Sequence, residues 1–193
     1  SVGSYYHGRH TGGFGLLSAF SFNGNKIITT GGGGAIATND STLAARAKHI
    51  TTTAKKPHPY LFVHDEVGYN YRMPNINAAL GVAQLEQLPA FLAAKRDLSA
   101  RYRDACAALG NRVTFVNEPE NCRSNYWINA ILVPDRAERD ALLEASNAAG
   151  IMTRPVWEPM HTLSMYAACP RDALDTTAAL AARIVNIPSS ANL

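Results

Sequence analysis

The chain has 193 residues, of which 47% are hydrophobic and 17% are charged, so it can build a packed core and is not a disordered chain. A formal net charge of +3 is too weak to indicate nucleic-acid binding, and no apolar run reaches the ~20 residues that a membrane span needs. The three cysteines form no C-x-x-C pair, which argues against a disulfide framework and a structural zinc site. We expect a cytoplasmic, globular protein.

The glycine-rich beginning of the chain predicts strands. Residues 19–22 alternate apolar and small side chains, which is typical of a short strand. Two runs of mainly β-branched and apolar residues, 26–30 and 35–38, then flank four consecutive glycines at 31–34. These runs predict a hairpin whose turn needs backbone that glycine adopts readily.

A helix and a long irregular segment should follow. Asp40 or Ser41 can cap a short helix that ends near His49. Residues 51–74 show no periodicity and contain three prolines and several aromatic side chains. A segment of this kind indicates an ordered functional loop rather than a linker.

Apolar side chains recur at helical spacing from residue 78 to residue 109, with Pro89 predicting a break and Gly110 an end. The second half predicts a small sheet covered by helices, which is an α+β pattern. Its expected strands span 113–116, 126–133, 151–156 and 184–188, and its expected helices span 136–149 and 173–183. We expect two domains, 1–89 and 90–193.

Lys26 is a candidate for covalent chemistry. It lies between the first expected strand and the glycine turn, and Ser21, five residues earlier, offers a hydroxyl to a phosphate oxygen. An amine nucleophile beside an anion site suits pyridoxal phosphate, whose ring carries both an aldehyde and a phosphate. From spacing alone, a surface lysine beside a tight turn is the more common explanation. A P-loop is excluded, because the glycines follow the lysine instead of preceding it.

Four separated segments resemble the DegT/DnrJ/EryC1/StrS family, whose members are pyridoxal-phosphate aminotransferases acting on nucleotide-linked keto sugars. The segments are GSYYHGRHTG (3–12), SFNGNKIITTGGGG (21–34), GYNYRMPN (68–75) and RPVW through MH (154–161). The resemblance implies an α/β fold that is part of the PLP-transferase type I (aspartate aminotransferase-like) fold. Residues 1–89 would be the end of the large, cofactor-binding domain, and residues 90–193 the small α+β domain without its last helix.

The resemblance also implies roles for individual residues. Lys26 would hold the cofactor covalently and shuttle a proton, and Ser21 would bind the cofactor phosphate. Asn70 would reach the phosphate of a neighbouring subunit's cofactor, so we expect a homo-oligomer. His161 would face the sugar nucleotide.

The implied reaction transfers an amino group from glutamate, through the cofactor, to a 4-keto-6-deoxy sugar on a nucleoside diphosphate. The Asn23-Gly24-Asn25 form of the lysine motif resembles that of members acting at C4 of UDP-linked sugars. Arg72 and Arg154 could clamp the substrate diphosphate, because a planar guanidinium matches phosphate oxygens. A surface or interface ion pair is an equally open explanation for each arginine.

No metal site is expected. His7 and His10 are three residues apart, but the glycines around them make a helix that would align them improbable. His58, His64 and Asp65 are better explained by packing within their loop.

By the resemblance, these residues correspond to the second half of a family member, and the first half holds the aspartate that pairs with the pyridine nitrogen. We therefore expect an aminotransferase fragment that is inactive alone and needs a separate N-terminal half. Two alternatives remain open: a degenerate remnant without catalysis, and a non-catalytic module that binds relatives or sugar nucleotides.

Overall fold

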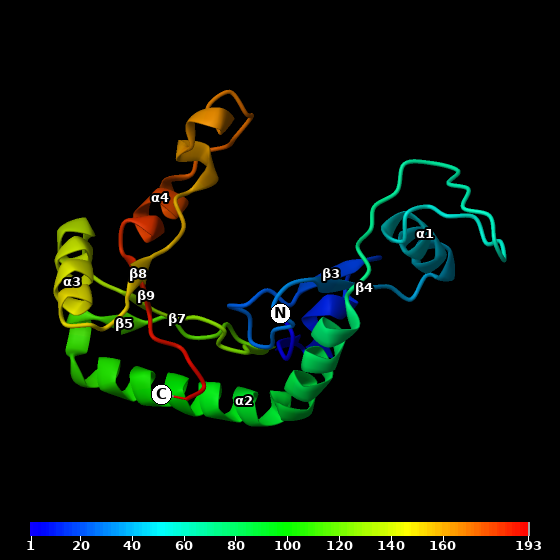
Figure 1. The fold of residues 1–193 in the computed structure, drawn as a ribbon. Coiled ribbons are helices and arrows are strands. Elements are labelled where there is room, and N and C mark those ends of the chain that lie inside the picture. The colour runs from blue at the N-terminus through cyan, green and yellow to red at the C-terminus, as the bar shows by residue number, and fades with distance from the viewer. Residues whose placement is uncertain (193) are drawn as a thin grey trace. The chain divides into compact units, whose positions relative to one another are not determined.

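The computed structural model describes residues 1–192, which divide into two compact units (Figure 1). The first unit comprises residues 1–92 and 119–125, and the second comprises residues 93–118 and the chain from 126 onward. Each unit mixes helices with antiparallel strands. Within the described residues, none of the helices combines the length and the apolar character that crossing a membrane requires.

The first unit holds two small sheets. One has the order β2-β1-β6 and is formed by β1 (Tyr5–Tyr6), β2 (Arg9–His10) and β6 (Cys122–Arg123). The side chain of Asn125 extends this pairing by donating to the carbonyl of Val2 at 2.9 Å. These contacts explain why residues 119–125 belong to the first unit although they follow α2 in sequence.

The second sheet of this unit is the pair of β3 (Ser18–Ser21) and β4 (Gly34–Ala37). β3 confirms the strand expected at 19–22, but the expected hairpin between 26–30 and 35–38 is wrong. β4 pairs with β3, in a register that sets Ser21 opposite Gly34, and no strand forms over 26–30. The β-branched run at 26–30 instead reflects burial, since Ile28 and Thr30 are only 2% and 3% exposed.

The helix expected after Asp40 is confirmed as α1 (Ser41–Thr51). The Asp40 carboxylate accepts hydrogen bonds from the backbone N–H groups of Thr42 and Leu43 at 2.8 and 3.0 Å, which satisfies donors that a helix start leaves unpaired. Residues 52–74 then run without a helix or an extended strand, as predicted. Isolated bridges from Thr52 to Asn70 and from Lys55 to His64 give this loop its order.

α2 (Asn75–Ala108) continues through Pro89, so the predicted break is wrong. A proline in a helix removes one backbone hydrogen bond and costs about 3 kcal/mol, which packing of the flanking turns can offset. Downstream of Pro89, the side chains of Leu98 and Cys106 are buried in the second unit. Tertiary packing therefore maintains the helix where local propensity favours an interruption.

The second unit is the expected sheet with its helices. The sheet has the order β5-β7-β9-β8, from β5 (Thr114–Phe115), β7 (Asn129–Leu132), β9 (Ile184–Ile187) and β8 (Arg154–Pro155). Two helices, α3 (Arg136–Ala148) and α4 (Asp175–Ala181), match the predicted ones. The 3₁₀ turns are Thr11–Gly13 in the first unit and Gly110–Arg112, Met160–Thr162 and Ser164–Tyr166 in the second. The core contains Cys106, Phe115, Tyr126, Ile131 and Val185.

A buried polar group ties the C-terminal segment to α2 within the second unit. Ser99 Oγ lies 2.5 Å from Asn129 Oδ1, and the Asn129 backbone N–H donates to Ser189 Oγ at 2.8 Å. The Lys95 ammonium donates to the carbonyl of Ser189, and burial lowers the pKa of Lys95. Buried polar groups of this kind are tolerated because they are hydrogen-bonded.

Candidate functional site

The loop that carries Lys26 is closed at its neck by backbone hydrogen bonds. Phe22 N donates to Gly33 O at 3.0 Å, one step beyond the Ser21–Gly34 strand pair. The carbonyl of Phe22 accepts from Thr30 N at 3.0 Å and from Thr29 Oγ1 at 3.1 Å. Residues 22–33 therefore form a tied loop, and Ser21 is the last strand residue before it.

Lys26 itself is held on both sides. Its backbone N–H donates to Asn23 O at 3.0 Å, which closes a turn, and the next two residues, Ile27 and Ile28, are 8% and 2% exposed. The Lys26 side chain is half-buried. These contacts fix the position of the Lys26 backbone, and hence the point from which its side chain extends. A lysine that binds a cofactor covalently needs such a fixed position.

Two polar side chains of α2 hold the far end of this loop. Asn77 Nδ2 donates to Thr30 O, and Gln84 Oε1 accepts from Thr29 N at 3.3 Å. The sequence analysis missed both residues. Their spacing of seven, which places two residues on one face of a helix, was the signal available in the sequence.

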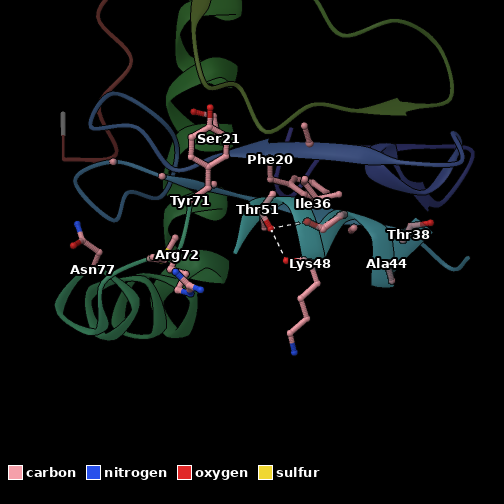
Figure 2. A pocket seen from close by; sticks show the side chains of 18 of the residues that line it. Phe20, Ser21, Ile36, Thr38, Ala44, Lys48, Thr51, Tyr71, Arg72 and Asn77 are labelled. Atoms are coloured by element: carbon pink, nitrogen blue, oxygen red, sulfur yellow. Dashed lines mark hydrogen bonds between the residues drawn. The ribbon is translucent and has the colours of Figure 1, made fainter. Parts of the chain in front are cut away.

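A groove of about 1010 Å³ lies beside the β3–β4 pair in the first unit, and Figure 2 shows it with α1 and the start of α2 around it. Ser21 and Arg72, two of the sequence-predicted site residues, both line it. Lys48, Tyr71 and Asn77 also line it and were not predicted. The structure thus brings a hydroxyl, a guanidinium, an amide and an ammonium group to one concave surface.

The hydrogen bonds of Ser21, Asn70 and Arg72 leave donors available for an anion. Ser21 Oγ accepts from Asn23 N at 3.3 Å, which uses a lone pair and leaves the hydroxyl proton to be donated. Arg72 donates through Nη1 to Asn70 Oδ1 at 3.0 Å and through Nη2 to Thr52 O at 2.8 Å. Because a guanidinium only donates, the Asn70 oxygen faces it, and the Asn70 amide nitrogen is presented on the other side.

The remaining two predicted site residues belong to the second unit. Arg154 is exposed at the start of β8, and its Nη2 lies 3.0 Å from Met152 Sδ, which is a weak acceptor. His161 is half-buried in the 3₁₀ turn Met160–Thr162, where its carbonyl accepts from Arg171 at 3.4 Å. Among the described residues of this unit, neither the Arg154 nor the His161 side chain forms an ion pair with a carboxylate.

Comparison with known proteins identifies the family. The model of the DegT/DnrJ/EryC1/StrS aminotransferase family matches residues 1–193. The chain belongs to this family. Aminotransferases of the DegT/DnrJ/EryC1/StrS family use pyridoxal phosphate, and the resemblance noted in the sequence is thereby confirmed.

Individual members of the DegT/DnrJ/EryC1/StrS family agree in sequence and fold. GDP-perosamine synthase of Caulobacter vibrioides is 39% identical, over 100% of this chain and 52% of its own length. The putative pyridoxal phosphate-dependent aminotransferase EpsN of Bacillus subtilis is 36% identical, over 86% of this chain and 42% of its own. The crystal structure of the aminotransferase TlmJ from Streptoalloteichus hindustanus superposes with a TM-score of 0.91 at 25% identity, covering 100% of this chain and 52% of that one.

These matches establish the predicted fold class, which is part of the PLP-transferase type I fold. The chain spans about half the length of the relatives it matches.

Proposed function

We propose that residues 1–193 form the lysine-bearing half of a pyridoxal-phosphate-dependent aminotransferase that moves an amino group from glutamate to a nucleotide-linked 4-keto-6-deoxy sugar. The observation that carries this proposal is the anchoring of Lys26. Its loop is tied at a neck that ends on Ser21, and the lysine is followed directly by buried Ile27 and Ile28. An amine on an anchored stretch of backbone, close in sequence to a hydroxyl that can bind phosphate, suits this cofactor.

The donor set of the first unit fits pyridoxal phosphate. The Lys26 primary amine suits the aldehyde, and the Ser21 hydroxyl suits a phosphate oxygen. The backbone of Gly34 also lines the groove, and a Cβ there would lie 2.2 Å from Phe20 O, so only glycine keeps β3 and β4 this close at that wall. In an oligomer, we infer that Asn70 serves the cofactor of the neighbouring subunit.

The bound cofactor would supply an electron sink for the amino transfer. In this proposal, Lys26 Nζ holds the cofactor and then moves a proton at the carbon that gains or loses nitrogen. Ser21 binds and orients the phosphate, while Arg72 and Arg154 bind the substrate diphosphate. His161 faces the sugar nucleotide and orients it.

A GDP-linked sugar is the first substrate to test. The relative that matches this chain over its whole length at 39% identity is a GDP-perosamine synthase. The Asn23-Gly24-Asn25 motif resembles that of members acting at C4 of UDP-linked sugars, so an assay should offer both nucleotides.

Residues 1–193 are proposed to need the other half of the family fold for activity. The family resemblance places the aspartate that pairs with the pyridine nitrogen outside these residues. A carboxylate beside that nitrogen favours its charged form, on which the electron sink depends. Amino transfer should therefore appear only when both halves of the fold are present.

The test uses the protein assembled with the half of the fold that lies outside residues 1–193. Borohydride reduction in the presence of pyridoxal phosphate should attach the cofactor to Lys26, and glutamate-dependent amination of the keto sugar should follow in the unreduced protein. Lys26→Ala should abolish both, whereas Lys56→Ala, at an exposed lysine of the loop 52–74, should change neither. Attachment or transfer that persists in a folded Lys26→Ala protein would overturn the proposal. Binding of a sugar nucleotide without cofactor attachment would instead support a non-catalytic module.

A further inference from the structure

Three side chains of the first unit meet at the end of α1, away from the residues assigned above. His49 lies in the last turn of α1, and Asp65 and Glu66 lie in the loop 52–74. His49 Nε2 is 2.7 Å from Asp65 Oδ1 and 3.4 Å from Glu66 Oε1. One ligand atom from each residue lies within 4.8 Å of the other two.

The donor types and their spacing suit a small divalent ion. An imidazole nitrogen with two carboxylate oxygens is a set that Zn²⁺ accepts, with bonds of about 2.0–2.2 Å. In a tetrahedral site, bonds of that length set the ligand atoms about 3.3–3.5 Å apart. The 3.4 Å separation of His49 and Glu66 already matches this spacing, and the 2.7 Å separation of His49 and Asp65 needs to open by only about 0.6 Å.

The three side chains are accessible to an ion. They are 28%, 36% and 34% exposed for His49, Asp65 and Glu66, so an ion can enter and water can complete its coordination. Carboxyl groups such as those of Asp65 and Glu66 are anionic at neutral pH. Ligands of a divalent ion must be deprotonated, and these carboxylates already are.

Arg46 is the competitor for this site. Both of its terminal nitrogens donate to the Glu66 carboxylate, one to Oε1 and the other to Oε2 at 2.6 Å. An ion at Glu66 Oε1 must displace one of these contacts, and it would lie beside the positive guanidinium, which repels it. Arg46 therefore weakens binding through its charge.

The neighbouring histidines are engaged elsewhere. His64 Nδ1 lies 2.7 Å from the carbonyl of Thr53, and His58 Nδ1 accepts from Leu61 N at 2.9 Å. The sequence analysis considered Asp65 together with His58 and His64 because they are close in sequence. It missed His49, which is sixteen residues from Asp65.

We propose that His49, Asp65 and Glu66 bind a divalent transition-metal ion such as Zn²⁺, with water in the fourth position. The ion ties the loop 52–74 to α1. Asn70 and Arg72 lie in the same loop, so the ion also steadies the segment that carries these two side chains. The proposal does not depend on the aminotransferase assignment.

Calorimetric titration of the purified, EDTA-treated protein with Zn²⁺ tests this site. We expect one saturable site whose affinity falls at least about tenfold in His49→Ala and in Glu66→Gln. His58→Ala, a matched change at an exposed histidine of the same loop, should retain the wild-type affinity. Equal affinity in all four proteins, or no saturation up to about 1 mM Zn²⁺, would overturn the proposal.

Arg46→Gln and a cobalt spectrum give readouts that misfolding cannot mimic. Removing the competing guanidinium should strengthen Zn²⁺ binding about fivefold, because a positive charge beside the ion is lost, although the same change removes an ion pair from the protein. Co²⁺ should give the visible absorption of a four-coordinate ion in the wild type and lose it in Glu66→Gln. Weaker Zn²⁺ binding in Arg46→Gln, or a Co²⁺ spectrum unchanged by Glu66→Gln, would contradict the assignment.

Discussion

Alanine should have opposite effects at two positions in the run of four glycines. A Cβ on Gly34 would lie 2.2 Å from the backbone oxygen of Phe20 on the paired strand, whereas a Cβ on Gly32 would meet nothing within 4 Å. Because Cβ contacts under 3.0 Å essentially never occur, Gly34→Ala must move β3 and β4 apart by about 0.8 Å. Neither residue has a positive φ, so the difference between them is steric.

The expected magnitude follows from that clash. Overpacking a well-packed site costs about 1–3 kcal/mol. Alanine at an unstrained glycine position instead stabilises by about 0.4–1 kcal/mol, because the unfolded chain loses freedom. Gly34→Ala should therefore lower the free energy of unfolding, while Gly32→Ala should leave it equal or slightly higher.

Hydrogen exchange at the Phe22 amide is the sharpest assay, because this N–H donates to Gly33 O at the neck of the lysine loop. A local loss of 1–3 kcal/mol corresponds to exchange faster by about 5- to 150-fold. Ser21 is paired with Gly34, so cofactor affinity should weaken in parallel if Ser21 binds the phosphate. Equal exchange rates in the Gly34→Ala and Gly32→Ala proteins would refute the reasoning.

Three further predictions address the cap, the buried polar group and the ion pair. Asp40→Ala should destabilise the protein by about 1 kcal/mol, because two N–H groups of α1 lose their acceptor, and a chemical-denaturation midpoint equal to that of the wild type would contradict this. Ser99→Ala should cost about 1–3 kcal/mol by leaving the buried Asn129 oxygen without its donor, which denaturant titration would detect as a lower midpoint at constant slope. Arg46→Gln should raise the pKa of Glu66 toward its ordinary value, and NMR titration of this carboxyl measures it. Since a depressed carboxyl pKa contributes stability that is lost as the pH falls, the variant should also lose less stability on acidification than the wild type. An unchanged Glu66 titration would show that Arg46 does not set this pKa.

Much of the fold could be predicted because its signals are local. Asp40 begins α1 through a side-chain cap, and Asp135 begins α3 in the same way by accepting from Glu138 N at 2.9 Å. The strands of the second unit lie where β-branched and apolar side chains cluster, and Val185 and Ile131 face its core. Caps and hydrophobic patterns involve residues that are close in sequence, so they can be recognised without knowledge of the tertiary structure.

The lysine loop shows where local signals mislead. The run from Lys26 to Thr30 has strand-like composition, yet Ile27 and Ile28 are apolar because they are buried in a loop. β4 pairs with β3, and the two strands are separated by a twelve-residue loop. The residue composition of the strands does not indicate this pairing. Pro89 misleads in the opposite direction, because burial of side chains beyond it maintains α2.

The sequence by itself determined the family, the elements of the second unit and the candidate residues Lys26, Ser21 and Asn70, because motifs and caps are short. Only the tertiary structure decided that Ser21 and Arg72 share a groove and that His49 meets Asp65 and Glu66. These groups come from segments separated by more than fifteen residues. Their meeting depends on how α1, β3 and the loop 52–74 pack, which no spacing along the chain encodes.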